Sequence, residues 1–174
     1  MSVTGIEIRR LLPTDATLYR DIRLEALRSD PGAFGSTFAI ESTKPLTWFE
    51  ERLGDAAVFG GFDRADLLGV AGFFVHRGAK EGHKGVLWGM YVRARARKTG
   101  LGRRLVDAVV DHAREHVEIL QLRVVEGNEP ARRLYARLGF VEYGIEKNSL
   151  KQDGRYWDEV LMAKPLAAGR GTPP

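Results

Sequence analysis

The chain contains no cysteine among its 174 residues. This absence excludes disulfides, metal sites built on thiolates and a cysteine nucleophile. Long apolar runs are also missing, since no stretch approaches the roughly 18 apolar residues that a membrane-spanning helix needs. The first ten residues lack the apolar core of a signal peptide. We therefore predict a cytoplasmic protein with no membrane partner.

Histidine is scarce as well, with four residues in the chain. Only His112 and His116 have the spacing, i and i+4, that suits two ligands of one metal ion. Both fall on a charged segment that is predicted to be helical and offers no third ligand close by. We therefore expect no metal cofactor.

The net charge is a modest +4, but the basic residues are unevenly distributed. Six of them fall within the twelve positions 93–104, around a glycine pair. A nucleic-acid-binding patch is one interpretation, and attraction of a cofactor that carries several phosphate charges is another. Because the segment lacks interleaved aromatic residues on which bases could stack, we expect no nucleic-acid partner.

The glycine pair stands directly in front of a predicted helix start. Residues 97–102 read Arg-Lys-Thr-Gly-Leu-Gly, between a predicted buried strand over 85–92 and an amphipathic helix over 101–116. Glycines let backbone N–H groups approach phosphate oxygens, and the helix N-terminus adds the positive end of its dipole. The order strand, glycine loop, helix suits a phosphate cradle, although a plain tight turn explains the loop alone equally well.

A second motif follows at 128–140, reading Asn-Glu-Pro-Ala-Arg-Arg-Leu-Tyr-Ala-Arg-Leu-Gly-Phe. In this order and spacing, the two segments resemble the GNAT superfamily of acyl-CoA-dependent N-acyltransferases. The first is similar to that family's pyrophosphate loop, Gln/Arg-x-x-Gly-x-Gly/Ala, and the second to its Asn-x-x-Ala-x-x-Leu-Tyr-x-x-x-Gly-Phe segment. The loop departs from the commonest family wording at Lys98, where relatives have glycine, and at Ala94, where many have proline.

The order of predicted elements indicates an α/β (α+β) fold with a mostly antiparallel, mixed sheet. The resemblance implies flanking helices and a parallel strand pair that splays apart, so that the amide-rich pantetheine arm pairs with the exposed backbone. We expect one N-acetyltransferase domain over 1–166 and a flexible tail over 167–174. The other expected elements are a strand over 6–11, a helix from a Thr14 cap to Ser29, irregular chain over 34–44, a helix over 47–53, a hairpin of 57–62 and 67–76, a strand over 119–125, a helix over 129–138, and an end hairpin of 141–150 and 155–163.

The resemblance implies that the chain transfers the acetyl group of acetyl-CoA to a primary amine by direct attack. It assigns polarisation of the thioester carbonyl to a backbone N–H at Met90 or Tyr91. Asn128 has the position of a helix N-cap, and the resemblance adds a cofactor contact. The expected cofactor-binding residues are Met90, Tyr91, Val92, Arg97, Lys98, Thr99, Gly100, Leu101, Gly102, Arg103, Asn128 and Tyr135.

Tyr135 is the candidate acid that protonates the leaving sulfur. Its spacing places it on the inward stripe of its helix, which suits a core tyrosine equally, and its place in the family motif favours the catalytic role. Transfer of a proton from a phenol near pKa 10 to a thiolate near 8.5 is uphill by about 2 kcal/mol. The contribution of Tyr135 is therefore moderate unless nearby cations lower its pKa, and Arg132 and Arg133 are the local candidates for that effect.

The proton acceptor for the amine is open. Many relatives place a glutamate on the splayed strands, but residues 85–92 contain no carboxylate and Arg123 stands where some relatives have glutamate. Glu126 and Glu41 are the candidates, although each is also readable as a surface carboxylate. A water chain without a dedicated base is the third possibility.

The acceptor itself is not named by the sequence. Residues 14–55 hold eight acidic against five basic side chains, which mildly favours a cationic amine. Candidate acceptor-site residues are Phe34, Glu41 and Trp88. A noncatalytic acyl-CoA sensor is the alternative function, and pairing along the end hairpin would allow a homodimer.

Overall fold

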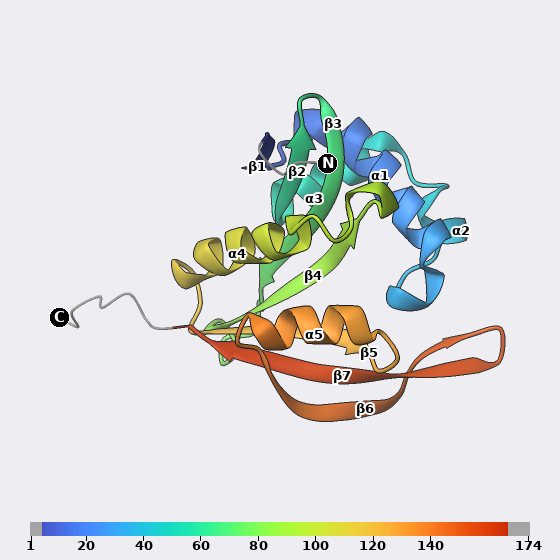
Figure 1. Cartoon of the computed structure of the whole chain (residues 1–174). Helices are drawn as coiled ribbons and strands as arrows, with labels where there is room; N and C mark the ends of the chain where they lie inside the picture. The colour runs from blue at the N-terminus through green and yellow to red at the C-terminus, as the bar shows by residue number, and fades with distance from the viewer. Residues whose placement is uncertain (1–4, 167–174) are drawn as a thin grey trace. The chain divides into compact units, whose positions relative to one another are not determined.

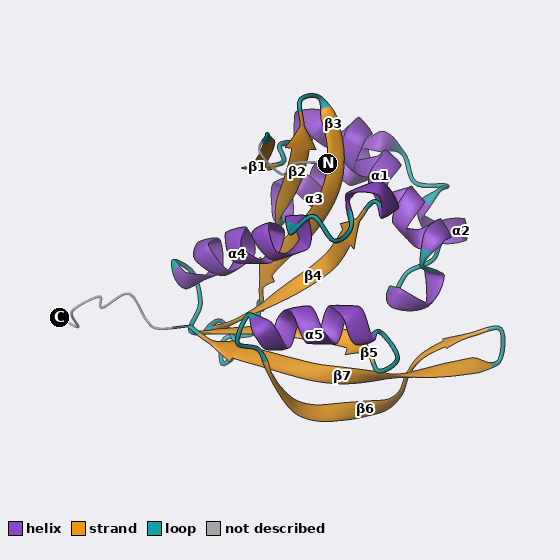
Figure 2. Cartoon of the chain, in the orientation of Figure 1, coloured by secondary structure: helices purple, strands orange, loops and turns teal. Residues whose placement is uncertain are grey.

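The computed structural model describes residues 5–166 (Figure 1). The expected tail over 167–174 lies outside these residues. Figure 2 distinguishes the helices from the strands. Three helices follow the first strand, three strands come next, and short 3-10 turns lie in front of α1, α2 and α4. In chain order the elements are β1 (Ile6–Arg10), α1 (Ala16–Ser29), α2 (Phe38–Glu41), α3 (Leu46–Asp55), β2 (Ala57–Asp63), β3 (Asp66–Val75), β4 (Lys84–Val92), α4 (Leu101–Arg114), β5 (Ile119–Val125), α5 (Glu129–Arg137), β6 (Val141–Gln152) and β7 (Arg155–Pro165).

The strands form one seven-stranded sheet in the order β1-β2-β3-β4-β5-β7-β6. β4 and β5 pair in parallel through three residue pairs, from Lys84↔Ile119 to Val86↔Gln121. β5 pairs with β7 in antiparallel fashion along its whole length. Residues 87–92 of β4 and 122–125 of β5 therefore lie beyond the parallel ladder. The mixed sheet with a parallel pair that separates after its first residues is confirmed.

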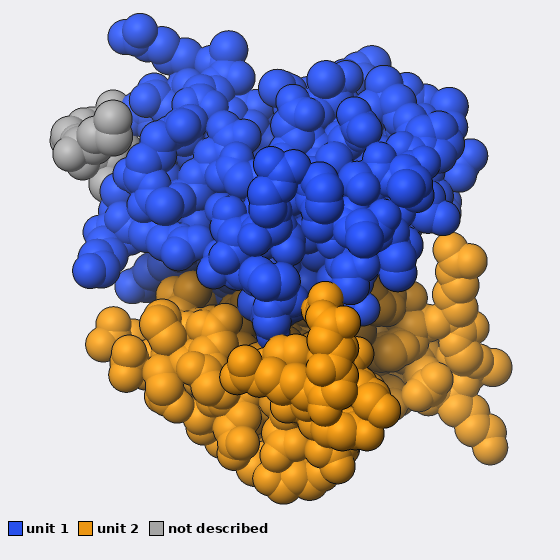
Figure 3. Space-filling view, turned by 90° about the vertical axis from the view of Figure 1, so that its right-hand side faces the viewer, with its two compact units in different colours: residues 1–72, 89–106 blue, residues 73–88, 107–174 orange. Residues whose placement is uncertain are grey.

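The chain comprises two compact units, coloured separately in Figure 3. The first contains residues 1–72 and 89–106, and the second contains residues 73–88 and 107–174. β4 and α4 each contribute residues to both units. The single domain over 1–166 stays a prediction.

In the first unit, α1 packs against α3. The rings of Tyr19 and Phe49 meet edge to face at 6.2 Å between centroids, and both side chains are buried. The predicted Thr14 cap is wrong, because a 3-10 turn over Pro13–Asp15 precedes the helix. Instead, the Asp15 carboxylate accepts a hydrogen bond from the Leu12 backbone N–H at 2.8 Å.

A short helix, α2, falls inside the stretch 34–44 that we expected to be irregular. The hydroxyl of Thr37 accepts a hydrogen bond from the backbone N–H of Ile40 at 3.3 Å and so caps its first turn. Four residues are too few to show the periodicity by which helices are recognised in a sequence. The expectation of an irregular segment is therefore wrong at this point.

In the second unit, α5 is tied to the hairpin of β6 and β7. Arg132 donates to Oε1 of Glu142 on β6 at 2.8 Å, and Lys164 on β7 donates to the carbonyl of Leu138 at 2.6 Å. The hairpin turns at Asp153 and Gly154, which both have positive φ, as the sequence predicts. These two side-chain hydrogen bonds thus hold α5 against its strands.

No helix within residues 5–166 combines the length and the apolar composition needed to cross a bilayer.

Candidate active site

β4 contains an irregular backbone position in front of Met90. Gly89 has φ +63°, a left-handed conformation that interrupts the extended strand. Such an interruption re-aims the backbone groups that follow it. An isolated glycine inside a strand pattern is the sequence signal for such a position. The N–H groups of Met90 and Tyr91, proposed carbonyl polarisers, come directly after this position.

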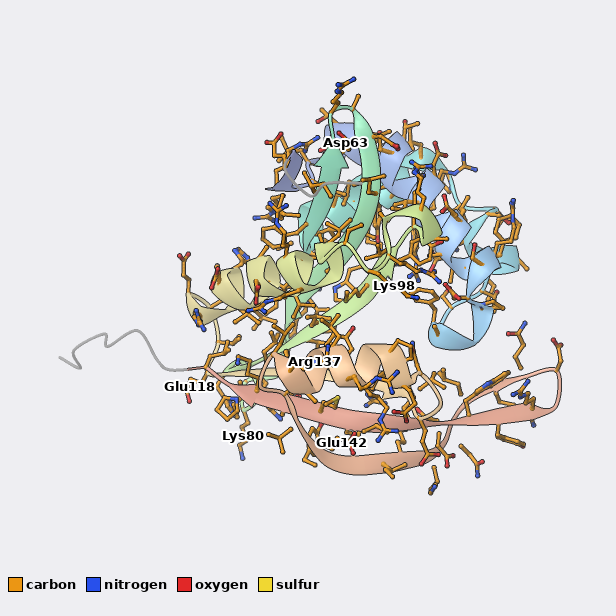
Figure 4. The ribbon with its side chains drawn as sticks, viewed as in Figure 1. Asp63, Lys80, Lys98, Glu118, Arg137 and Glu142 are labelled. Carbon is orange, nitrogen blue, oxygen red and sulfur yellow. The ribbon has the colours of Figure 1, made fainter. Side chains whose placement is uncertain are left out.

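The loop between β4 and α4 holds two left-handed residues separated by one position. Lys98 has φ +62° and Gly100 has φ +86°, and the hydroxyl of Thr99 between them donates to the carbonyl of Ala96 at 2.7 Å. Figure 4 labels Lys98 on this loop. Alternation of handedness turns successive backbone N–H groups toward one side, an arrangement that binds anions.

The start of α4 supplies further backbone donors. The N–H of Arg104 donates to the carbonyl of Gly100 at 3.2 Å, so the N–H groups of residues 101–103 precede this first helical bond. Leu101 is buried and anchors the helix start, whereas the Arg103 side chain is exposed. A positive dipole end thus meets the loop.

The basic side chains around the loop are partly matched by acidic ones in the same unit. Arg97 donates to the carbonyl of Val92 at 3.0 Å and to Oδ2 of Asp30 at 2.8 Å. Its guanidinium also lies 5.7 Å from the centre of the Tyr91 ring. The Tyr91 hydroxyl in turn donates to Oε1 of Glu25 at 3.2 Å. These contacts fix the loop against α1.

The loop fits a diphosphate on conformational grounds. A Cβ built on Gly100 would meet no other heavy atom within 4 Å, so free space surrounds the residue and its positive φ alone favours glycine. An exposed glycine loop that is followed by a helix start and flanked by arginines is suited to phosphate oxygens. The described residues therefore fit the diphosphate of a coenzyme.

In the second unit, Asn128 caps α5. Its Oδ1 accepts a hydrogen bond from the backbone N–H of Ala131 at 3.3 Å, and Pro130 occupies the first turn, as Pro does at helix starts. The predicted capping role is confirmed.

Tyr135 on α5 is 6% exposed, and its ring packs edge to face on Phe140 at 5.8 Å. Burial raises the pKa of Tyr135 above its ordinary value. The pKa is therefore not lowered by Arg132 or Arg133, the two candidates for that effect. Arg132 binds the carboxylates of β6 and the first turn of α5, and Arg133 lies 4.0 Å from Oε2 of Glu129.

Glu126 lies just beyond β5 and its side chain is exposed. Its backbone is anchored, since its N–H donates to the carbonyl of Asp158 at 3.0 Å. Arg123, which replaces the glutamate of some relatives, forms an ion pair with Glu146 of β6. Trp88 is half-buried.

Glu41 is 2% exposed and forms a bidentate ion pair with Arg23 of α1, so the interpretation of Glu41 as a surface carboxylate is wrong. Burial alone would raise the pKa of Glu41, but the hydrogen bonds and charge of Arg23 outweigh burial, and the pKa is lowered. Phe34 stacks under the Arg23 guanidinium at 5.2 Å. Sequence reasoning missed Arg23, because 18 residues separate the pair and no local pattern joins them.

Within residues 5–166, no three potential metal ligands lie together. The ring of His112 packs edge to face on Phe73 at 5.5 Å, and Nδ1 of His116 lies 2.8 Å from the carbonyl oxygen of His112. Both histidines thus have contacts within the fold.

Known proteins share the sequence pattern. The chain matches the acetyltransferase (GNAT) family over residues 20–140. It is 28% identical over 151 residues to the L-methionine sulfoximine/L-methionine sulfone acetyltransferase of Pseudomonas aeruginosa, across 81% of this chain and 87% of that protein. It is 26% identical over 165 residues to the phosphinothricin N-acetyltransferase of Streptomyces coelicolor, across 92% and 96% of the two chains. Neither relative favours a noncatalytic sensor.

Solved structures share the fold. The GNAT acetyltransferase of Streptococcus pneumoniae superposes with a TM-score of 0.82 at 21% identity, over 94% of this chain and 100% of that one. The structure of yncA from Salmonella typhimurium, which holds its cofactor acetyl-CoA, gives 0.81 at 22% identity over 98% of both chains. With its strand order, parallel pair and family match, the chain belongs to the GNAT acetyltransferase family and is an acetyl-CoA-dependent N-acetyltransferase.

Proposed function

We propose that residues 97–103 bind the diphosphate of acetyl-CoA, mainly through backbone N–H groups. The observation that carries this assignment is the left-handed pair Lys98 and Gly100 directly before the start of α4. Bound there, acetyl-CoA supplies the thioester that the amine attacks. The full proposed set is Met90, Tyr91, Val92, Arg97, Lys98, Thr99, Gly100, Leu101, Gly102, Arg103, Asn128 and Tyr135.

The backbone N–H that follows Gly89 polarises the thioester carbonyl in this proposal. A left-handed residue inside a strand changes the direction of the N–H that follows it. A fixed backbone donor aimed at a carbonyl oxygen stabilises the negative charge that develops there. Met90 is the first such donor, and Tyr91 is held by its hydrogen bond to Glu25.

Tyr135 donates the proton to the leaving sulfur. Burial keeps its hydroxyl protonated across the physiological range, which an acid requires. The same burial makes the proton transfer more uphill than it would be for an exposed phenol. Tyr135 therefore gives up its proton as the thiolate forms. Its contribution to the rate grows with the negative charge that the leaving sulfur carries in the transition state.

Glu126 is the carboxylate we assign to accept the proton of the amine. It is exposed and fixed by its backbone at the end of β5, whereas Glu41 is committed to Arg23. Glu126→Gln should lower kcat/KM at neutral pH by at least about tenfold, and Glu115→Gln, another exposed glutamate, should not. Equal rates for both variants would leave a water chain as the acceptor.

The acceptor in our proposal is the amine of a small amino-acid-type molecule. Two relatives that align along most of this chain are named for L-methionine derivatives and for phosphinothricin. Phe34 and the buried Glu41–Arg23 pair lie in the unit that contains Met90, and they provide an aromatic face and a guanidinium for a small polar ligand. Trp88, which lies in the second unit, also stays a proposed acceptor residue.

A panel of amines tests this proposal through release of the coenzyme thiol, to which a chain without cysteine adds no background. L-methionine sulfone, L-methionine sulfoximine and phosphinothricin should be acetylated with kcat/KM at least tenfold above a polyamine, an aminoglycoside and a peptide N-terminus. A preference for any of the latter three would contradict the acceptor class. Absence of thiol release with every amine would contradict the assigned site.

A further inference from the structure

The guanidinium of Arg23 lies beside the irregular position of β4. A Cβ built on Gly89 would be 3.9 Å from Nη1 of Arg23, and among the described residues no other heavy atom beyond the chain neighbours of Gly89 comes within 4 Å. Gly89 directly precedes Met90, whose N–H we assign to the thioester carbonyl. Arg23 therefore faces open space next to the proposed reaction centre.

The other two guanidinium nitrogens of Arg23 are occupied. Nε donates to Oε2 of Glu41 at 2.8 Å, and Nη2 donates to Oε1 at 2.7 Å. Nη1 makes no hydrogen bond to any residue between 5 and 166. The residue is 5% exposed as a whole, but Nη1 is not among the buried donors that lack a partner, so this donor is accessible to solvent beside Gly89.

The pair is built to orient this donor. A buried ion pair gives little net stability, because removing two charges from water offsets their attraction. What it does give here is a guanidinium fixed in its plane by two parallel hydrogen bonds and by the Phe34 ring at 5.2 Å. An oriented guanidinium donor that solvent can reach is available to an anionic ligand, and a hydrogen bond between charged groups is stronger than one between neutral groups.

We propose that Nη1 of Arg23 binds the carboxylate of an amino-acid acceptor and so selects acids over neutral amines. This inference rests on the proposed function, in which the acceptor is a small amino-acid-type amine. The ligand class follows from chemistry, because a guanidinium donates only and matches carboxylate oxygens. Glu41 acts as a positioning residue that orients Arg23 without touching the acceptor.

The test compares L-methionine sulfone with its carboxamide, which differ only at the carboxylate. The chain should prefer the acid by about 10- to 100-fold in kcat/KM, mostly through KM, the range expected for a hydrogen bond to a charged group. The double variant R23Q/E41Q removes both charges together. Its ratio of kcat/KM for the acid to kcat/KM for the carboxamide should fall to about threefold or less.

Two further variants keep the test decisive. Arg23→Lys retains the charge opposite Glu41 but lacks the second arm toward Gly89, so the ratio should fall there too, even if the double variant does not fold. Arg28→Gln is the matched control, since Arg28 lies on the same helix and stacks on Phe38 at 4.3 Å, and its ratio should equal that of the wild type.

The outcomes separate the two proposals. Equal use of acid and amide by the wild type, or an unchanged ratio in Arg23→Lys and the double variant, overturns the role of Arg23 and leaves the acceptor class standing. Failure of the wild type to acetylate either compound while a polyamine or peptide reacts overturns both.

Discussion

Nη2 of Arg97 lies 2.8 Å from Oδ2 of Asp30, which ties the glycine loop to the end of α1. The two side chains are 46% and 41% exposed, so solvent screens the pair and its contribution to stability is small. The pair matters for cofactor binding, because the Asp30 carboxylate competes with the diphosphate for the guanidinium of Arg97.

Asp30→Asn should lower the KM for acetyl-CoA by about two- to fivefold, the scale of an exposed ion pair. The variant removes both a competitor for Arg97 and a negative charge near the phosphates. Initial rates at low salt measure the effect, which should shrink at high salt. Asp55→Asn, at the exposed end of α3, is the control. An increase in KM would show instead that Asp30 positions Arg97 for the cofactor.

Gly100→Ala should raise the KM for acetyl-CoA at least about tenfold. The reason is conformational: at φ +86° a Cβ costs about 1–2 kcal/mol, although no neighbour within 4 Å would clash with it. The loop relieves this strain by turning its N–H groups away from the phosphates. Gly127→Ala, at a glycine with equally open surroundings and no positive φ, serves as the control. An unaltered KM in Gly100→Ala would remove the loop from the cofactor site.

Lys98→Gly should raise the free energy of unfolding by about 0.5–1 kcal/mol. Lys98 has φ +62°, where a residue with a Cβ is strained, and the relief exceeds the entropic cost of glycine. The midpoint of urea denaturation measures the gain. Lys98→Ala keeps the strained Cβ, so a gain in that variant as well would trace the effect to charge rather than to backbone.

Tyr135→Phe should lower kcat by about 10²–10⁴. Burial raises the pKa of Tyr135, so its hydroxyl loses its proton only above the ordinary value near 10. The variant should therefore lose activity evenly from pH 6 to 9, with no titration step assignable to Tyr135 in that window. Tyr143→Phe, which alters an exposed tyrosine of the same unit, is the control. Unchanged turnover in Tyr135→Phe would show that Tyr135 contributes to packing and not to catalysis.

Acid should weaken the first unit through Glu41. The folded-state pKa of Glu41 is lowered from 4.5, so its stabilising effect is complete above that value and is lost as the pH falls through the lowered pKa. The melting temperature of the wild type should drop below about pH 4.5 more steeply than that of the R23Q/E41Q variant. If the melting temperatures of the two proteins fell equally with pH, the loss of stability in acid would not come from protonation of Glu41.

Much of the fold followed from periodicity and turn residues. β5 was predicted with its observed bounds, and the end hairpin turned at the expected Asp153 and Gly154. These features are local, because alternation and glycine chemistry act between near neighbours. The four-residue α2 was too short for such a signal.

Some local features of the proposed site also followed from the sequence. The glycine loop and the Asn128 cap can be recognised from their residue types and spacing. The positive φ of Lys98 explains why relatives have glycine at this position. The Arg23–Glu41 pair and the raised pKa of Tyr135 arise from burial between segments distant in sequence, which no local pattern encodes.

A crystal structure of the protein with acetyl-CoA tests the central claim most directly. We predict diphosphate oxygens within hydrogen-bond distance of backbone nitrogens in residues 98–103, about 2.7–3.2 Å. A diphosphate bound elsewhere, or held by arginine side chains with the loop N–H groups facing away, would contradict the account.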